Sequence, residues 1–133
     1  MGVNETGMGN VGDKILKHHL TADKVPGTED ISTIAWSGDR GLTLVEMGPF
    51  GVIGAITPAT NPSETVICNC IGMLAGGNTV VFNPHPNAKK TTIYTINMIN
   101  EASIEAGGPD NIAVTVEAPT LDTSAIMMKH PSI

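Results

Sequence analysis

Aromatic and charged side chains are both scarce in this chain. Of its 133 residues, 3% are aromatic and 15% are charged, whereas charged residues make up about 25% of an average soluble domain. Hydrophobic residues reach 41%, which is enough to build the core of one domain of ordinary size. A surface so lean in charge predicts that part of it is covered by further chain or by a partner.

Basic runs and long apolar runs are missing as well. The net charge is −6 and the basic residues are scattered, which argues against a nucleic-acid surface. No apolar run approaches the roughly 20 residues that span a bilayer, and the N-terminus lacks the basic and apolar regions of a signal peptide. We therefore expect no nucleic-acid partner, no membrane segment and a cytoplasmic location.

Cysteine is limited to Cys68 and Cys70, a spacing that suits neither a disulfide framework nor a zinc site. Both fall within a predicted buried helix, so we expect buried, unreactive thiols. The adjacent His18 and His19 are predicted to be exposed and solvated. No histidine has acidic or cysteine partners at ligand spacing, so we predict no metal site.

The first 47 residues predict a helical segment followed by a hairpin. Asn10 is a suitable N-cap for a helix from Val11 to about Leu20. Two short strands at residues 31–36 and 42–47, joined by a turn at 37–41, predict a β-hairpin. Its apolar edges favour pairing with another chain.

From Phe50 onward, strands and helices alternate. The expected strands are residues 50–57, 78–83 and 111–116, and the expected helices are 62–75, 88–106 and 120–128. Strand starts about 30 residues apart are typical of βαβ units with parallel strands. The predicted fold class is therefore α/β. Residues 48–133 form the first half of a doubly wound, Rossmann-like sheet, after a helical segment (1–30) and a hairpin (31–47).

Cap residues and apolar stripes refine these helices. Asn61 and Glu64 have the spacing of a capping box at the start of the first helix, and Asn87 is the expected cap of the second. The second helix is predicted to be amphipathic, with an apolar stripe through Tyr94, Met98 and Ala102 and with Ile96 and Ile99 beside it.

Two loops follow strands at the carboxyl edge of the predicted sheet, where α/β proteins bind ligands. In the loop at 57–62, the side chains of Thr60 and Asn61 could stabilise a developing oxyanion. Alternatively, Asn61 only caps the helix, and the residues alone favour this simpler role. The Pro-rich loop at 83–87 forms a rigid turn around His85 that suits a nucleotide, or is only a tight connection.

Glycine-rich phosphate motifs are absent, although the chain has 15 glycines. Neither G-x-G-x-x-G nor G-x-x-x-x-G-K-[ST] occurs. We expect Gly48, Gly51 and Gly54 to allow close backbone packing rather than to cradle a phosphate.

Residues 48–82, with the loops at 57–62 and 83–86 and the upstream run at 5–10, resemble the aldehyde dehydrogenase superfamily. The loop sequences are similar to those of the CoA-acylating branch that acts on acetaldehyde or propionaldehyde. The resemblance implies NAD and coenzyme A as cofactor and co-substrate, a small aldehyde as substrate, and a catalytic cysteine that forms a thioester with the acyl group.

The resemblance also implies roles for individual residues. Thr60 or Asn61 would support the oxyanion, a choice that stays open. The cofactor-binding residues it implies are Ile56, Thr57, Pro58, Ala59 and Thr60 on the nicotinamide side, and Asn83, Pro84, His85 and Pro86 by the adenosine ribose. Residues 31–47 would form the hairpin through which subunits of a homo-oligomer pair. The location implied is the cytoplasm or a bacterial microcompartment.

Three departures from the family pattern matter. Thr60 aligns with the oxyanion-binding Asn of hydrolytic members, whereas Asn83 and Pro86 replace their Lys and Glu. Neither Cys68 nor Cys70 matches the catalytic cysteine, which lies in a later domain. We therefore expect a fragment that is inactive alone. The alternatives are a non-enzymatic α/β assembly or binding module, and a hydrolytic aldehyde dehydrogenase, against which the loop sequences argue.

Overall fold

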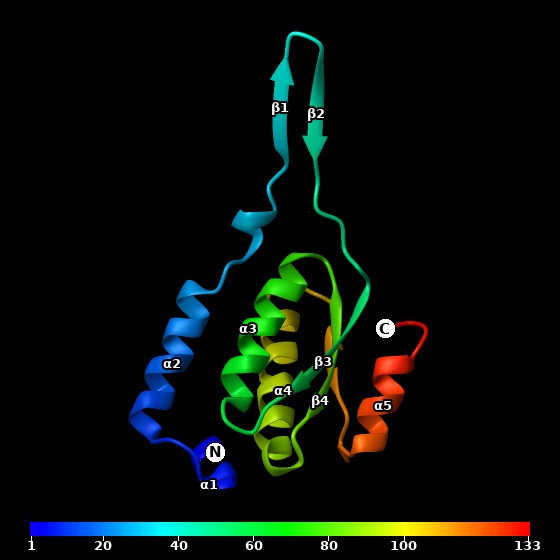
Figure 1. Cartoon of the computed structure of the whole chain (residues 1–133). Helices are drawn as coiled ribbons and strands as arrows, with labels where there is room; N and C mark the ends of the chain where they lie inside the picture. Colours follow the sequence, from blue (N-terminus) through cyan, green and yellow to red (C-terminus); the bar gives the residue numbers. More distant parts are fainter.

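The computed structural model describes all 133 residues as an α/β body from which a hairpin projects (Figure 1). The body contains a parallel sheet in the order β3 (Val52–Thr57), β4 (Thr79–Pro84) and β5 (Ala113–Thr115). The strands begin at residues 52, 79 and 113, so the predicted βαβ spacing and the predicted fold class are confirmed.

Helices lie on both faces of this sheet. Helices α3 (Pro62–Ala75) and α4 (Lys89–Glu105) cover one face, and α5 (Leu121–Lys129) lies against the other. Strand β4 contributes side chains to the packing on both faces of the sheet, because alternate side chains of a strand point to opposite faces. The core on the α3 and α4 side consists of Ala55, Val66, Cys70, Val80, Phe82, Ile96 and Ala113.

Close packing requires glycine at one of the three positions where it is predicted. A Cβ atom on Gly54 would lie only 2.8 Å from Ile133 Cγ2 and 3.4 Å from Met127 Cγ, so Gly54 lets the C-terminal segment approach the sheet. The prediction is wrong for Gly48 and Gly51, which have open space around them. Gly51 instead adopts a φ of +112°, which an L side chain rarely tolerates.

The N-terminal segment is more helical than predicted. It contains α1 (Gly2–Thr6), α2 (Val11–Lys24) and the short 3-10 helix η1 (Thr28–Ile31). Of these, only α2 is predicted, and its predicted end at Leu20 is four residues too early. The cap on α2 is confirmed, because Asp13 N donates to Asn10 Oδ1 at 2.9 Å.

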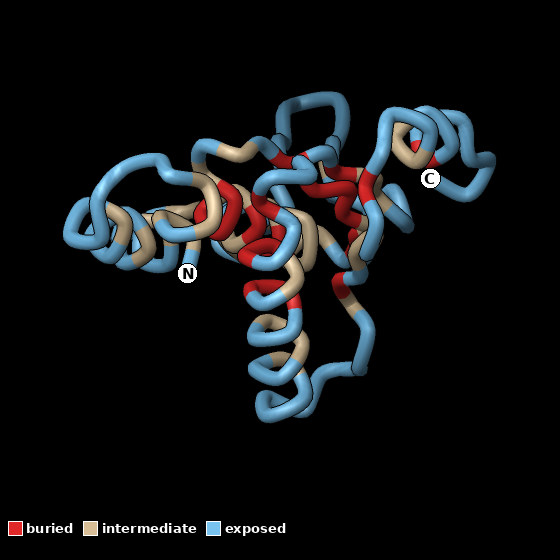
Figure 2. The backbone as a smooth tube through the Cα atoms, turned by 90° about the horizontal axis from the view of Figure 1, so that it is seen from below, coloured by how far each residue is buried: buried red, intermediate tan, exposed pale blue.

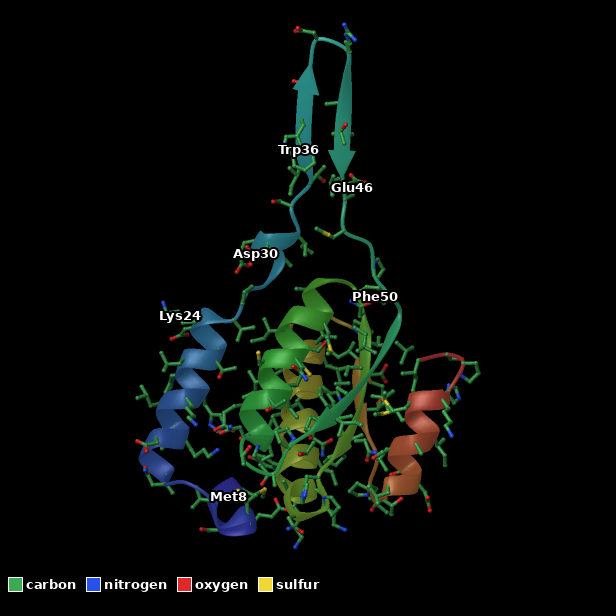
Figure 3. All side chains as sticks on the ribbon, viewed as in Figure 1. Met8, Lys24, Asp30, Trp36, Glu46 and Phe50 are labelled. Carbon is green, nitrogen blue, oxygen red and sulfur yellow. The ribbon has the colours of Figure 1, made fainter.

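The hairpin consists of β1 (Ile34–Gly38) and β2 (Gly41–Val45), paired from Ile34 with Val45 to Gly38 with Gly41. Its turn is shorter than predicted, since only residues 39 and 40 lie between the strands. Nearly every hairpin residue is exposed. The tube coloured by burial shows that the buried residues gather in the sheet and its helices (Figure 2). Trp36 lies on the projecting β1 and is 57% exposed (Figure 3).

The prediction for the apolar face of α4 is right for Ile96 and Ile99, which are buried and half-buried, and wrong for its main stripe. Tyr94 and Met98 are exposed, and the buried face carries Thr91, Thr92 and Thr95 with Ile96. The threonines can be buried because their hydroxyls bond within the helix: Thr92 Oγ1 donates to Ala88 O at 3.0 Å and Thr95 Oγ1 donates to Thr91 O at 2.8 Å.

Candidate functional site

The two predicted loops lie side by side at the carboxyl edge of the sheet. The register pairs Ile56 with Asn83 and Thr57 with Pro84, and the backbone N–H of His85 donates to Thr57 O at 3.0 Å. The parallel pairing of β3 and β4 therefore brings residues 56–61 and 83–86 to one edge, where open α/β sheets bind ligands.

The first loop presents a mixed surface. Ile56, Pro58 and Thr60 are exposed, whereas Ala59 and Asn61 are half-buried. Thr57 is buried, and its hydroxyl has no hydrogen-bond partner in the chain. An unsatisfied buried hydroxyl is costly, and Thr57 Oγ1 has too little exposed surface to contact a ligand directly.

Asn61 does not cap helix α3, so that prediction is wrong. Its side chain makes no capping hydrogen bond. Its Oδ1 instead accepts from Lys14 Nζ at 2.9 Å and from Lys17 Nζ at 3.3 Å. Ammonium groups from α2 compete successfully with the N–H groups of α3 because hydrogen bonds from charged donors are stronger.

Glu64 does not complete a capping box but pairs with Lys14, whose Nζ lies 3.1 Å from Glu64 Oε1. Burial alone would raise the pKa of this carboxyl. Its own backbone N–H, Lys14 and the hydroxyl of Ser63 outweigh burial and lower the pKa below its usual 4.5. Glu64 is therefore an ionised carboxylate at neutral pH, although it is nearly buried.

His18 is half-buried rather than solvated as predicted. Its Nε2 lies 2.7 Å from Ser63 Oγ, and Ser63 Oγ donates to Glu64 Oε2 at 3.1 Å. In a Ser-His-acid triad the carboxylate bonds the other ring nitrogen, whereas here the nearest approach of Glu64 is 3.9 Å from the same Nε2. The three groups form a structural network and not a relay that activates Ser63.

The second loop is held by its own residues and by α5. Asn83 Nδ2 donates to Ser124 Oγ at 2.6 Å, while Asn83 Oδ1 is buried without a partner. His85 is exposed, and its Nδ1 accepts from Asn87 N at 3.1 Å. Pro84 is buried and Pro86 is exposed.

Glu5, a residue that the sequence analysis does not identify, takes the capping role predicted for Asn87. Asn87 lies in the 3-10 helix η2 (Pro86–Ala88), before α4 begins. The carboxylate of Glu5 accepts from Lys90 N at 2.8 Å and from Thr91 N and Oγ1 at 2.7 and 2.6 Å. Ala88, the residue before α4, supplies no side-chain cap, so the first N–H groups of the helix need partners from elsewhere. No local sequence pattern points to Glu5 as that partner.

The charge on Glu5 is stabilised by these bonds. Burial would raise the pKa of the carboxyl, but the Thr91 hydroxyl, the two backbone N–H groups and the charge of Lys90 together lower it below 4.5. Glu5 thus ties the N-terminus to the helix that follows the second loop.

The two cysteines differ, contrary to the prediction that both are buried. Cys70 packs in the core, and burial raises the pKa of its thiol to about 12. Cys68 is exposed on α3, because positions two apart on a helix point in different directions. No group of three or more His, Cys, Asp or Glu residues gathers in a way that could hold a metal ion.

Comparison with known proteins decides the family. A model of the aldehyde dehydrogenase family matches residues 5–133. The chain belongs to this family. Among curated relatives, it is 52% identical to an acetaldehyde dehydrogenase (acetylating) of Bilophila wadsworthia over 130 residues, which are 98% of this chain and 27% of that protein.

Solved structures of aldehyde dehydrogenases share the fold. A propionaldehyde dehydrogenase from the Clostridium phytofermentans fucose utilisation bacterial microcompartment superposes with a TM-score of 0.95 at 75% identity, covering 99% of this chain and 30% of that one. A propionaldehyde dehydrogenase of Rhodopseudomonas palustris, solved with bound propionyl-CoA, gives a TM-score of 0.94 at 54% identity, covering 99% and 29%. The chain therefore spans less than a third of the length of these aldehyde dehydrogenases.

The family assignment agrees with the architecture. The parallel sheet of three strands and the antiparallel hairpin match the corresponding portion of the solved aldehyde dehydrogenases. No helix combines the length and the apolar character needed to cross a membrane.

Proposed function

We propose that residues 1–133 contribute to a CoA-acylating aldehyde dehydrogenase. The reaction converts a short aldehyde, coenzyme A and NAD+ into acyl-CoA, NADH and a proton. The observation that carries the proposal is the meeting of the two loops at one sheet edge, Thr57 O to His85 N, in a chain 75% identical to a solved propionaldehyde dehydrogenase. The names of the relatives supply the acylating reaction and the class of aldehyde.

The residues at this edge fit a dinucleotide. Thr57 Oγ1 and Asn83 Oδ1 lack partners within the chain but are fully buried, so the ligand contacts at this edge come from its exposed residues. Exposed Ile56 and Pro58 offer apolar contacts for a flat ring on the nicotinamide side, while residues 83–86 would lie by the adenosine ribose. When bound, NAD+ supplies the hydride acceptor.

In this proposal, Thr60 or Asn61 serves the chemical step. Both follow β3 at the candidate edge, and each has a donor group that no atom of the chain uses. A hydrogen-bond donor aimed at the aldehyde oxygen stabilises the negative charge that develops there when a thiolate attacks. The division into residues 1–30, 31–47 and 48–133 is part of the same proposal.

The hairpin at residues 31–47 would serve homo-oligomer assembly. Trp36 and Leu44 lie on opposite faces of it, and both are exposed. Exposed apolar strands are a ready template for pairing with another chain. We further propose a cytoplasmic enzyme held in a bacterial microcompartment, as the source of the similar Clostridium phytofermentans structure suggests.

The test is an activity assay of the full-length protein, obtained by expressing the complete reading frame that contains these residues. We expect NADH to form from propionaldehyde or acetaldehyde only when coenzyme A is present, with acyl-CoA as the product. The 133-residue chain alone serves as the control and should be inactive. NADH formed equally well without coenzyme A would indicate a hydrolytic enzyme, and no NADH under any condition would favour a non-enzymatic assembly module.

A further inference from the structure

One ammonium group connects helix α2 to the loop before α3. Lys14 Nζ lies 2.7 Å from Thr60 O, 2.9 Å from Asn61 Oδ1 and 3.1 Å from Glu64 Oε1. An ammonium group carries three donors and no acceptor. Lys14 hydrogen-bonds to Thr60 O and Asn61 Oδ1 and forms an ion pair with the Glu64 carboxylate. The Lys14 side chain is only 15% exposed, which shows that its charge is balanced mainly by the loop and not by water.

Electrostatics make this connection strong. The side chain of Glu64 is 8% exposed, and its carboxylate is the counter-charge that permits Lys14 to be nearly buried. Removing one partner of a buried pair leaves the other charge uncompensated. The contact therefore resists opening, and it spans more than 40 residues of sequence between α2 and the loop.

The same contact fixes the orientation of the Asn61 amide. Lys17 Nζ also approaches Oδ1, at 3.3 Å. Since neither ammonium can accept a hydrogen bond, the amide oxygen must face α2 and the amide nitrogen must point the other way. Asn61 Nδ2 makes no hydrogen bond within the chain. Two cations on the oxygen also polarise the amide and strengthen its N–H groups as donors.

Thr60 differs from Asn61 in this respect. Lys14 holds the main-chain carbonyl of Thr60, and the exposed hydroxyl has no partner that would fix its rotation. A donor that is already oriented stabilises developing charge without the cost of reorganisation. The oriented donor of the loop is therefore the Asn61 amide.

We propose that Lys14 is the positioning residue of the loop at 57–62, and that it presents the Asn61 amide nitrogen, rather than the Thr60 hydroxyl, to the oxyanion. The donor role rests on the proposed function. The anchoring of the loop by Lys14 does not, because it concerns the chain alone.

Variants of the full-length protein test the positioning role. Lys14→Gln is expected to lower kcat about 10²-fold, while KM for NAD+ changes less than about threefold. Lys24→Gln removes the same charge from the far end of α2 (Figure 3) and should leave both constants unchanged. Ethylammonium added to Lys14→Ala should restore part of the lost rate. Equal rates for Lys14→Gln and Lys24→Gln would overturn the positioning role.

A second pair of variants identifies the donor. Asn61→Asp keeps an acceptor for Lys14 and Lys17, so the loop stays anchored, but it removes the N–H donor. We expect it to lose kcat about 10²-fold with an unchanged circular dichroism spectrum. Thr60→Val should lower kcat much less than Asn61→Asp, because the Thr60 hydroxyl is not the oriented donor. The reverse ranking of these two variants would assign the donor to Thr60 and overturn the inference for Asn61.

Hydrogen exchange separates failure of this inference from failure of the proposed function. The Thr65 N–H donates to Asn61 O at 3.0 Å, so Lys14→Gln should speed exchange of the amides at 59–65, and Lys24→Gln should not. Unchanged exchange in Lys14→Gln overturns the anchoring, whatever the activity. Faster exchange in a protein without activity refutes the proposed function and the donor role but supports the anchoring.

Discussion

At the scale of single residues, the site depends on side chains that reach across the sequence. Glu5 caps a helix that begins more than 80 residues later, and Lys14 holds a loop more than 40 residues away. Both are charged groups from the N-terminal helices that satisfy backbone or amide groups of the α/β body. The N-terminal segment therefore stabilises the two loops of the candidate site rather than merely preceding them.

Replacing Glu5 tests the first of these contacts. Glu5→Ala should lower the free energy of unfolding by about 1–2 kcal/mol at pH 7, since it removes the cap of α4. The folded-state pKa of Glu5 is lowered, so its contribution is present above the unfolded value of 4.5 and is lost as pH falls through the folded value. Urea unfolding at pH 7 and at pH 3 should show the difference shrinking in acid.

The control for this prediction is Glu101→Ala, which removes an exposed carboxylate from α4, the helix that Glu5 caps. It should change the free energy of unfolding by less than about 0.5 kcal/mol. If Glu5→Ala and Glu101→Ala are equally stable at pH 7, the capping role of Glu5 is wrong.

The two thiols should differ sharply in reactivity. With a pKa of about 12, Cys70 is ionised in only about one molecule in 10⁴ at pH 8, and the thiolate is the reactive form. Iodoacetamide should therefore modify Cys68 of the folded chain and leave Cys70 intact, whereas both react in concentrated urea. Peptide mass spectrometry reads the sites directly, with Cys68→Ser as the control. Modification of both at similar rates would contradict the burial of Cys70.

At the scale of elements, Asn78 links the end of α3 to the start of β3. Its Oδ1 accepts from Phe50 N at 2.6 Å and from Gly51 N at 3.0 Å, and its Nδ2 donates to Met73 O at 3.1 Å. One buried amide thus joins the entry of β3 to the last turn of α3.

Truncation of this amide should destabilise the α/β body. Asn78→Ala removes three hydrogen bonds, each of which contributes about 1 kcal/mol, so the free energy of unfolding should fall by about 2–3 kcal/mol. Asn97→Ala, on the exposed face of α4, is the matched control and should be neutral. Chemical denaturation measures both, and a loss below about 0.5 kcal/mol for Asn78→Ala would show that water replaces its bonds.

The elements themselves could be predicted from the sequence, but several side-chain roles could not. Strand and helix order follows from local patterns, and so does the cap at Asn10, whose partner is three residues away. The caps predicted at Asn61 and Asn87 fail because distant charged groups compete for the same atoms. Most of the buried face of α4 was missed because its threonines satisfy their hydroxyls within the helix.

The candidate site could likewise be predicted only in part. That residues 56–61 and 83–86 meet at one edge follows from two parallel strands, and the pairing of β3 with β4 confirms it. The roles of Glu5 and Lys14 could not be inferred, because no local pattern pairs an N-terminal helix with a loop far along the chain. The specific contacts that residues 56–61 and 83–86 would make with NAD remain predictions.

At the scale of the whole molecule, the chain leaves much apolar surface uncovered. Only 20 of 133 residues are buried, and large apolar side chains are exposed on the hairpin, α2 and α5. Exposed apolar area of this extent indicates contact with further protein, in agreement with a chain that spans less than a third of its relatives.

The hairpin provides the test at this scale. Trp36→Lys combined with Leu44→Lys places a charge on each face of the hairpin, where the two residues are 57% and 58% exposed. We expect the mass in solution to shift toward the monomer while the circular dichroism spectrum is unchanged, because neither side chain supports the core. Sedimentation of the full-length protein measures the shift, and Met128→Lys on α5 is the control. An unchanged mass would exclude the hairpin as the assembly surface.

The most direct test of the central claim is a structure of the full-length protein with NAD+ bound. The proposal predicts that the nicotinamide ring lies against residues 56–60 and the adenosine ribose against residues 83–86, with the Asn61 amide nitrogen facing the substrate side. A dinucleotide bound at another edge, with both loops empty, would contradict the proposal.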